Sequence, residues 1–78
     1  MRSADVLEYL AKQLVDFPDD VRVEVAEEDG ETVLELFVHA DDLGKVIGKR
    51  GRTAKALRTV VRAAASLDDQ NVSVEIVD

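Results

Sequence analysis

The sequence contains no cysteine and no tryptophan, and it has only one proline and one histidine. Without cysteine the chain forms neither a disulfide nor a cysteine-ligated zinc site, so the fold must depend on its hydrophobic core. Its apolar runs are a few residues long, far short of the roughly 18 that cross a bilayer, and no secretory signal is recognised. We therefore expect a soluble cytoplasmic protein with one domain spanning residues 1–78.

Basic residues are also scarce, since 10 Lys and Arg face 17 Asp and Glu and give a net charge of −7. Such an excess of acid argues against a nucleic-acid partner, because phosphates are bound through Lys and Arg. The distribution of charge reverses that inference. Seven cations and no acid lie between residues 45 and 62, whereas the rest of the chain carries three cations against 17 acids. Because salt screens charges beyond about 8 Å, a ligand at the basic stretch would interact mainly with that stretch.

The hydrophobic pattern of the first part of the chain predicts a helix followed by a strand. Apolar residues recur every three or four positions from residue 6 to residue 15, and we expect Ser3 to cap this helix. Pro18 ends it, because proline disfavours helical geometry in the preceding residue. From residue 21 the period changes to two, which predicts a strand whose buried face carries Val21, Val23 and Val25.

The rest of the chain predicts a hairpin, two adjacent helices and a last strand. Residues 27–31 form a polar turn with Asp-Gly as its strongest signal, and an antiparallel strand returns over residues 32–39. Asp41 or Asp42 can cap the helix that follows. The later elements are a short helix over 43–47, a helix from Arg52 or Thr53 to Ser66, and a strand over 72–76. In the longer helix we expect a core side formed by Leu57, Val60, Val61 and Ala64, opposite Lys55, Arg58 and Arg62.

The most informative segment is Val46-Ile47-Gly48-Lys49-Arg50-Gly51-Arg52, in which two glycines bracket two cations between two helices. Glycine lacks a Cβ atom, so the backbone at Gly48 and Gly51 can take left-handed geometry and another chain can approach it closely. The loop leads into a helix N-terminus, whose unpaired N–H groups and positive dipole favour phosphate. Lys49 and Arg50 can pair with flanking phosphates, and the positive strip continues along the helix through Arg52, Lys55 and Arg58.

Residues 47–51, Ile-Gly-Lys-Arg-Gly, match the I-G-x-x-G signature of the KH domain, and the resemblance covers nearly the whole chain. The predicted order α-β-β-α-α-β, with the glycine loop between adjacent helices, is similar to the type II, prokaryotic KH arrangement. More narrowly, the chain resembles the KhpA family of small bacterial proteins with a single KH domain. This resemblance rests on the segments 15–19, 43–59 and 74–76, and it implies an α+β fold with a three-stranded sheet packed on helices.

The resemblance also implies RNA binding without catalysis and without a cofactor. In KH domains the loop clamps single-stranded nucleic acid along its backbone while bases occupy an adjoining apolar groove. Carried over to this chain, the clamp is Gly48, Lys49, Arg50 and Gly51, with Lys45 among the nearby cations. We expect the groove wall to come from the second strand and from Val46, Ile47 and Ala54, which flank the loop.

KhpA-like proteins are described as RNA chaperones that pair with a second KH protein of the KhpB or Jag family and influence cell elongation and cell wall synthesis. Self-association through the glycine-loop face is also described, which would make dimerisation compete with RNA. The chain therefore has two open interpretations: an RNA-binding module, or a dimerisation and protein-interaction module with little RNA affinity. An enzyme is poorly supported, because the loop lacks the GxxxxGK[ST] pattern and no nucleophile has an adjacent base.

Other features favour structural roles. The three aromatic residues, Tyr9, Phe17 and Phe37, lie away from the loop in sequence, so base stacking is scarce and we expect weak, salt-sensitive binding with low sequence selectivity. His39 has no second histidine or cysteine with which to form a metal site. The acids of residues 27–31 lack the ligand spacing of a calcium loop. Residues 44–48 have GxxxG spacing but no surrounding apolar 20-mer.

Overall fold

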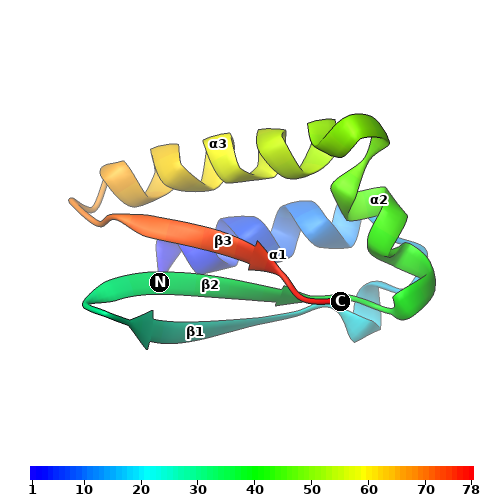
Figure 1. Ribbon diagram of the computed structural model, residues 1–78, viewed down its shortest axis with the longest axis horizontal. Helices are drawn as coiled ribbons and strands as arrows, with labels where there is room; N and C mark the ends of the chain where they lie inside the picture. Colours follow the sequence, from blue (N-terminus) through cyan, green and yellow to red (C-terminus); the bar gives the residue numbers. More distant parts are fainter.

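The computed structural model describes residues 1–78 and places a layer of helices over one face of a three-stranded sheet (Figure 1). The helices are α1 (Arg2–Leu14), α2 (Leu43–Ile47) and α3 (Arg52–Ser66), and the strands are β1 (Arg22–Glu28), β2 (Glu31–Phe37) and β3 (Val72–Ile76). Short 3₁₀ turns connect them at Pro18–Asp20, Ala40–Asp42 and Lys49–Gly51. This α+β class and the order α-β-β-α-α-β confirm the prediction. None of the helices has the length and apolar character of a membrane span.

The sheet has the order β1-β2-β3, with β1 antiparallel and β3 parallel to the central strand β2. The hairpin turn is shorter than predicted, because only Asp29 and Gly30 leave the strands, with φ of 52° and 79°. Two successive positive φ values are typical of the tight Asp-Gly turn whose twist matches the paired strands. Because β2 is central, it offers no free edge beside α3. That edge belongs to β3, so β3 and not the second strand lies beside α3, and the groove wall stays a prediction.

The core lies between the helices and the inner face of the sheet. It is built by residues from all three helices and from β2 and β3, among them Leu7, Leu34, Leu36, Val46, Leu57, Val61, Val72 and Val74. Two predicted core residues are exposed instead. Val25, in the middle of the edge strand β1, is 50% exposed. Val60 is 47% exposed because the buried stripe of α3 is formed by Ala54, Leu57, Val61 and Ala65, and Ala64 is only half-buried.

The start of α1 differs from the prediction. The helix begins at Arg2 with Met1 at the N-cap position, and no side chain caps it. Ser3 therefore lies in the first turn, fully buried, and its Oγ has no hydrogen-bond partner. The capping prediction for Ser3 is wrong because the helix starts before it, so its hydroxyl lies within the turn.

Candidate nucleic-acid interface

The loop between α2 and α3 is compact and consists largely of left-handed backbone. Gly48 ends α2 with φ of 76°, and its N–H donates to the carbonyl of Gly44 at 2.8 Å. Arg50 and Gly51 follow with φ of 60° and 73°, and the N–H of Gly51 donates to the carbonyl of Gly48 at 3.1 Å. Positive φ at three of four successive positions needs glycine at most of them. The positive φ values and the two backbone hydrogen bonds therefore define the geometry of the loop.

Gly48 packs directly against the first turn of α3. A Cβ atom at this position would overlap the side chain of Thr53, approaching its Cβ to 2.7 Å and its backbone nitrogen to 2.9 Å. Gly51 is different, because nothing lies within 4 Å of the place where its Cβ would be. The first glycine lets the loop close onto the helix, and the second leaves an open backbone that a ligand can approach.

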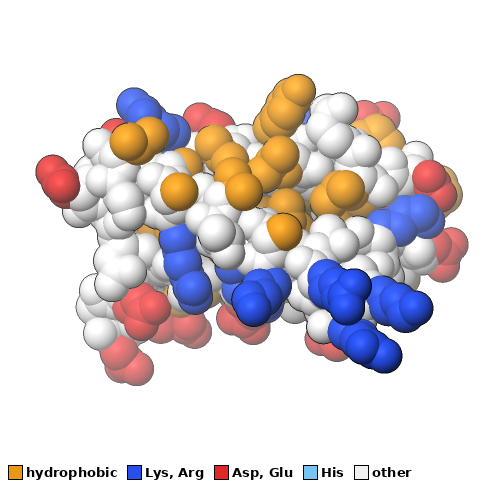
Figure 2. Space-filling view, turned by 90° about the horizontal axis from the view of Figure 1, so that it is seen from above, with side chains coloured by type: hydrophobic (Ala, Val, Ile, Leu, Met, Phe, Trp, Pro, Cys, Tyr) orange, Lys and Arg blue, Asp and Glu red, His pale blue; other side chains and the backbone are white.

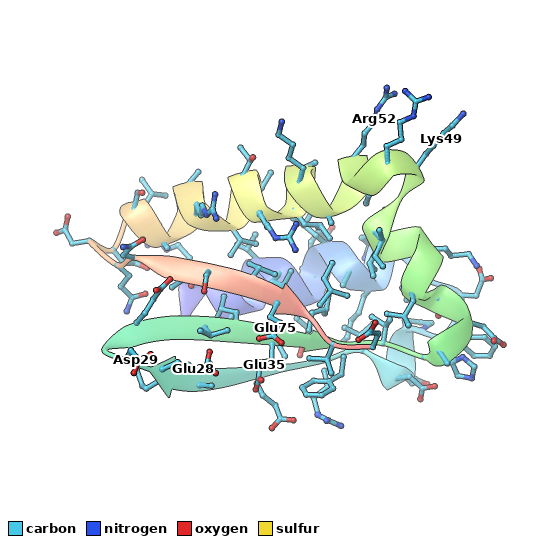
Figure 3. All side chains as sticks on the ribbon, viewed as in Figure 1. Glu28, Asp29, Glu35, Lys49, Arg52 and Glu75 are labelled. Atoms are coloured by element: carbon cyan, nitrogen blue, oxygen red, sulfur yellow. The ribbon has the colours of Figure 1, made fainter.

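Cations at the loop point away from the fold. Lys49, Arg50 and Arg52 are exposed, and neither they nor Lys55 form an ion pair within the chain. Figure 3 shows Lys49 and Arg52 extending outward from the junction of α2 and α3. Figure 2 shows basic side chains gathered along one edge of the helical layer. These four charges are free for an anionic partner.

The other predicted site residues have different surroundings. The Lys45 Nζ lies 3.0 Å from an oxygen of Asp16 and 3.5 Å from one of Asp42, so its charge is already paired. Val46 has no exposed surface and Ala54 almost none, which makes them core residues beneath the loop. Ile47, by contrast, is 39% exposed beside the loop.

Arg58 belongs to the basic side of α3 but is half-buried. Its Nε donates to the backbone carbonyl of Val74 at 3.4 Å, so the side chain reaches from the helix to the free edge of β3. Arg62, one turn further along, is exposed. The basic strip thus runs from the loop along α3, and Arg58 is the member that reaches β3.

Acidic residues gather at the opposite end and on the outer face of the sheet. The strand register aligns Glu24 with Glu35 and Glu35 with Glu75, which places three glutamates in one row across the sheet. Figure 3 shows Glu35 and Glu75 on the strands, and Glu28 and Asp29 at the hairpin, far from Lys49. The basic edge of the helical layer and the row of glutamates on the sheet are therefore separated in space, and the sheet repels anions.

Sequence patterns did not indicate that Asp42 is a buried anchor. Its carboxylate accepts hydrogen bonds from the backbone N–H of Asp16 at 3.2 Å and of Phe17 at 3.0 Å, and it pairs with Lys45. Burial raises the pKa of Asp42, but these hydrogen bonds and the charge of Lys45 outweigh burial and hold it below 3.8. The hydrogen bond and charge of Asp16, with those of Asp42, raise the pKa of Lys45 above 10.5. The cluster fixes the end of α1 against α2, just ahead of the loop.

Sequence patterns also missed an apolar groove between α1 and α3, on the side of the helical layer away from the sheet. Its volume is about 270 Å³, and it is lined by Leu10, Gln13, Leu14, Thr53, Ala56, Leu57 and Val60. Figure 2 shows apolar side chains across the middle of this face, beside the basic edge. The helical pattern predicts Val60 in the core, so it does not indicate an exposed apolar surface there.

The contacts of His39 are those of a structural residue. Its ring stacks on Phe17 with a centroid distance of 4.2 Å, and its Nδ1 accepts from the N–H of Asp41 at 3.0 Å. No group of three or more His, Asp or Glu side chains is placed to hold a metal ion.

Comparison with known proteins gives consistent matches over nearly the whole chain. The family model described as KhpA/KhpB, KH domain matches residues 4–76. The RNA-binding protein KhpA of Halalkalibacterium halodurans is 53% identical over 73 residues, which cover 94% of this chain and 96% of that protein. The protein of the same name from Bacillus subtilis is 50% identical over 74 residues, covering 95% of this chain and 90% of that protein.

Among solved structures, Aquifex aeolicus Era bound to GDP.AlF4- superposes with a TM-score of 0.64 at 20% sequence identity. The match covers 95% of this chain but only 29% of the Era chain. At this identity the similarity shows a shared fold and nothing more.

Proposed function

Because the chain belongs to the KhpA/KhpB KH-domain family, we propose that it is a non-catalytic RNA-binding protein that clamps single-stranded RNA through the loop of residues 48–51. The observation that carries this proposal is the loop itself: two glycines with positive φ, an open backbone at Gly51, and the exposed, unpaired cations Lys49 and Arg50 between the glycines. The relatives from H. halodurans and B. subtilis are named RNA-binding proteins, which supports the same ligand.

Phosphates would lie along the loop and the start of α3. The first N–H groups of α3 have no helical acceptor, and the helix dipole favours an anion there. Lys49 and Arg50 would pair with flanking phosphates, and Arg52 and Lys55 would extend the contact along the helix. Such contacts position a strand without reading its bases, so we expect low sequence selectivity and a strong dependence on salt.

The test is a titration of fluorescent single-stranded RNA with the wild type and with Lys49→Asp/Arg50→Asp at several salt concentrations. We expect the variant to lose affinity and its log-log salt dependence to flatten by about 0.7 per lost phosphate contact. Lys12→Asp/Arg22→Asp is the matched control, because it makes the same change in net charge at exposed sites away from the loop. Equal loss in both double variants, with the fold intact by circular dichroism, would contradict a site at the loop.

A second candidate function is protein interaction, favoured by the apolar groove between α1 and α3. In this groove the side chains of Leu14 and Val60 are 39% and 47% exposed. Exposed apolar surface is unfavourable in water, and association with a partner would bury it. The partner would be a second copy or a KhpB/Jag-type KH protein, whose name stands beside KhpA in the description of the family.

Sedimentation of Val60→Asp would test this second function. We expect a self-associating wild type and a monomeric variant, with Val25→Asp as the control because Val25 is equally exposed but lies on β1. A dimer of the wild type that binds no RNA at any salt would make interaction the main function. A monomeric wild type that binds no KhpB-type protein would exclude it.

For the cellular role, we infer a cytoplasmic RNA chaperone acting with a KhpB-type partner in cell elongation and cell wall synthesis. The support is the family resemblance alone. Complementation of a Bacillus subtilis strain that lacks its KhpA relative would test it, with cell length as the readout and Lys49→Asp/Arg50→Asp as the comparison. Failure of the wild type to change cell length would remove this role.

A further inference from the structure

Arg58 is the one half-buried arginine of this acidic chain, and it has no carboxylate partner. Arg2 pairs with Asp68 and Arg22 with Glu24, whereas the Nε of Arg58 donates only to the carbonyl of Val74. At 3.4 Å this hydrogen bond is at the long limit for N–H···O contacts, so little free energy is lost when it breaks. A guanidinium carries five donors and a flat face, and most of this capacity is unused.

The site lacks an aromatic ring on which a base could stack, and the guanidinium groups of Arg50 and Arg52 lie at the loop, where they would pair with phosphates. Phe17 is stacked on His39, Phe37 is covered by the guanidinium of Arg22 at 4.1 Å, and Tyr9 lies on α1. None of these rings belongs to α2, α3 or the loop between them.

Arg58 supplies a planar group further along α3, away from the loop. It lies six residues after Arg52, about 9 Å along the helix axis at 1.5 Å per residue, on the side of α3 that faces β3. Arg62 lies about 6 Å further from the loop, and its side chain forms no hydrogen bond with β3. Lys55 is closer to the loop but has no planar group.

We propose that Arg58 stacks its guanidinium on a base of the RNA strand held by the loop, leaving the Val74 carbonyl when RNA binds. This inference rests on the proposed RNA clamp and adds to it the residue that contacts a base. Guanidinium planes and aromatic rings both serve as stacking surfaces for unpaired bases. The freed carbonyl of Val74 lies at the sheet edge, where water or an amino group of the RNA satisfies it.

The experiment compares Arg58→Lys with Arg62→Lys, using an eight-nucleotide RNA and an abasic oligonucleotide of the same length. Both substitutions keep the charge and remove a guanidinium. We expect Arg58→Lys to weaken binding of the RNA at least about fivefold, the lower bound for one lost stack, and to leave binding of the abasic strand unchanged. Arg62→Lys should change neither.

Two results would overturn the assignment. Wild-type affinity of Arg58→Lys for the RNA would show that no base stacks there, and equal weakening for both ligands would show a phosphate contact instead. Urea unfolding of each variant reveals any loss of stability from the broken contact with β3. Lys49→Asp/Arg50→Asp is measured in parallel. If this double variant keeps wild-type affinity for the RNA, the proposed clamp itself is wrong. If it loses affinity while Arg58→Lys does not, only the assignment of Arg58 is wrong.

Discussion

The carboxylate of Asp42 accepts a hydrogen bond from the backbone N–H of Phe17 at 3.0 Å, although 25 residues separate the two in sequence. Asp42 is fully buried, and its second oxygen accepts from the N–H of Asp16. Lys45, one turn further along, pairs with both Asp16 and Asp42. The segment that leaves α1 is thereby tied to α2, the helix that ends at the glycine loop.

This anchor predicts a specific pH dependence of stability. The pKa of Asp42 is lower in the folded protein than its ordinary value of 3.8, so its ionisation stabilises the fold above that pH. The contribution disappears as the pH falls through the lower, folded pKa. Lys45 contributes in the opposite pH range, because its pKa is raised in the folded protein. Its contribution to the stability of the fold is complete below pH 10.5 and disappears as the pH rises through the folded pKa.

Thermal unfolding of the wild type and Asp42→Asn between pH 2 and 7 would measure the effect. We expect the variant to be less stable at pH 7, with a melting temperature lower by on the order of 10 °C, because an amide cannot accept both backbone hydrogen bonds or pair with Lys45. The gap should be constant above about pH 4 and should narrow below it. A gap independent of pH, or one equally large in the exposed control Asp41→Asn, would contradict the anchor.

The two loop glycines should respond differently to alanine. At Gly51 the added methyl meets nothing within 4 Å, so Gly51→Ala incurs only the left-handed backbone cost of about 1–2 kcal/mol. At Gly48 the same methyl overlaps Thr53 and the backbone conformation is one that glycine alone adopts readily, so the loss should exceed that of Gly51→Ala. Urea unfolding of both variants gives the comparison.

Partial rescue of Gly48→Ala by Thr53→Gly would identify the side-chain overlap as one part of the cost. If the two glycine variants were equally stable, the close packing of Gly48 on α3 would not exist in solution.

Sequence patterns predicted most of the fold and the loop of the site, because both depend on local signals. The I-G-x-x-G motif, the change of period at residue 21 and the Asp-Gly turn each act within a few residues. What was missed depends on contacts between distant segments: the anchoring of Phe17 by Asp42, the free edge of β3 beside Arg58, and the exposure of Val60. A pattern of period three to four defines an apolar side of α3, but it does not say which neighbour covers each part of that side.

Ser3 offers a case in which removal of a polar group should stabilise the protein. Its hydroxyl is fully buried in the first turn of α1 without a hydrogen-bond partner. An unsatisfied buried hydroxyl costs about 1 kcal/mol or more, and alanine is also the better helix former. We expect Ser3→Ala to raise the free energy of unfolding by about 1 kcal/mol.

Ser66→Ala is the control, since Ser66 is exposed and its Oγ donates to the carbonyl of Arg62 at 3.1 Å. This control substitution should change stability little. Destabilisation by Ser3→Ala would mean that this hydroxyl has a partner in solution.

The row of glutamates across the sheet should be a source of instability that salt relieves. Glu35 lies directly between Glu24 and Glu75 in the strand register, and like charges placed opposite one another destabilise a sheet. Glu35→Lys turns both repulsions into attractions, so it should raise the free energy of unfolding by about 0.5–1 kcal/mol at low salt. At 1 M salt the screening length is about 3 Å, and the gain should nearly vanish.

Asp78→Lys is the control for this prediction. It makes the same change in net charge at the end of the chain, without a cross-strand partner, so it distinguishes an effect of the glutamate row from an effect of overall charge. A gain for Glu35→Lys that persisted at 1 M salt, or one matched by Asp78→Lys, would show that the alignment of the three glutamates is not its cause.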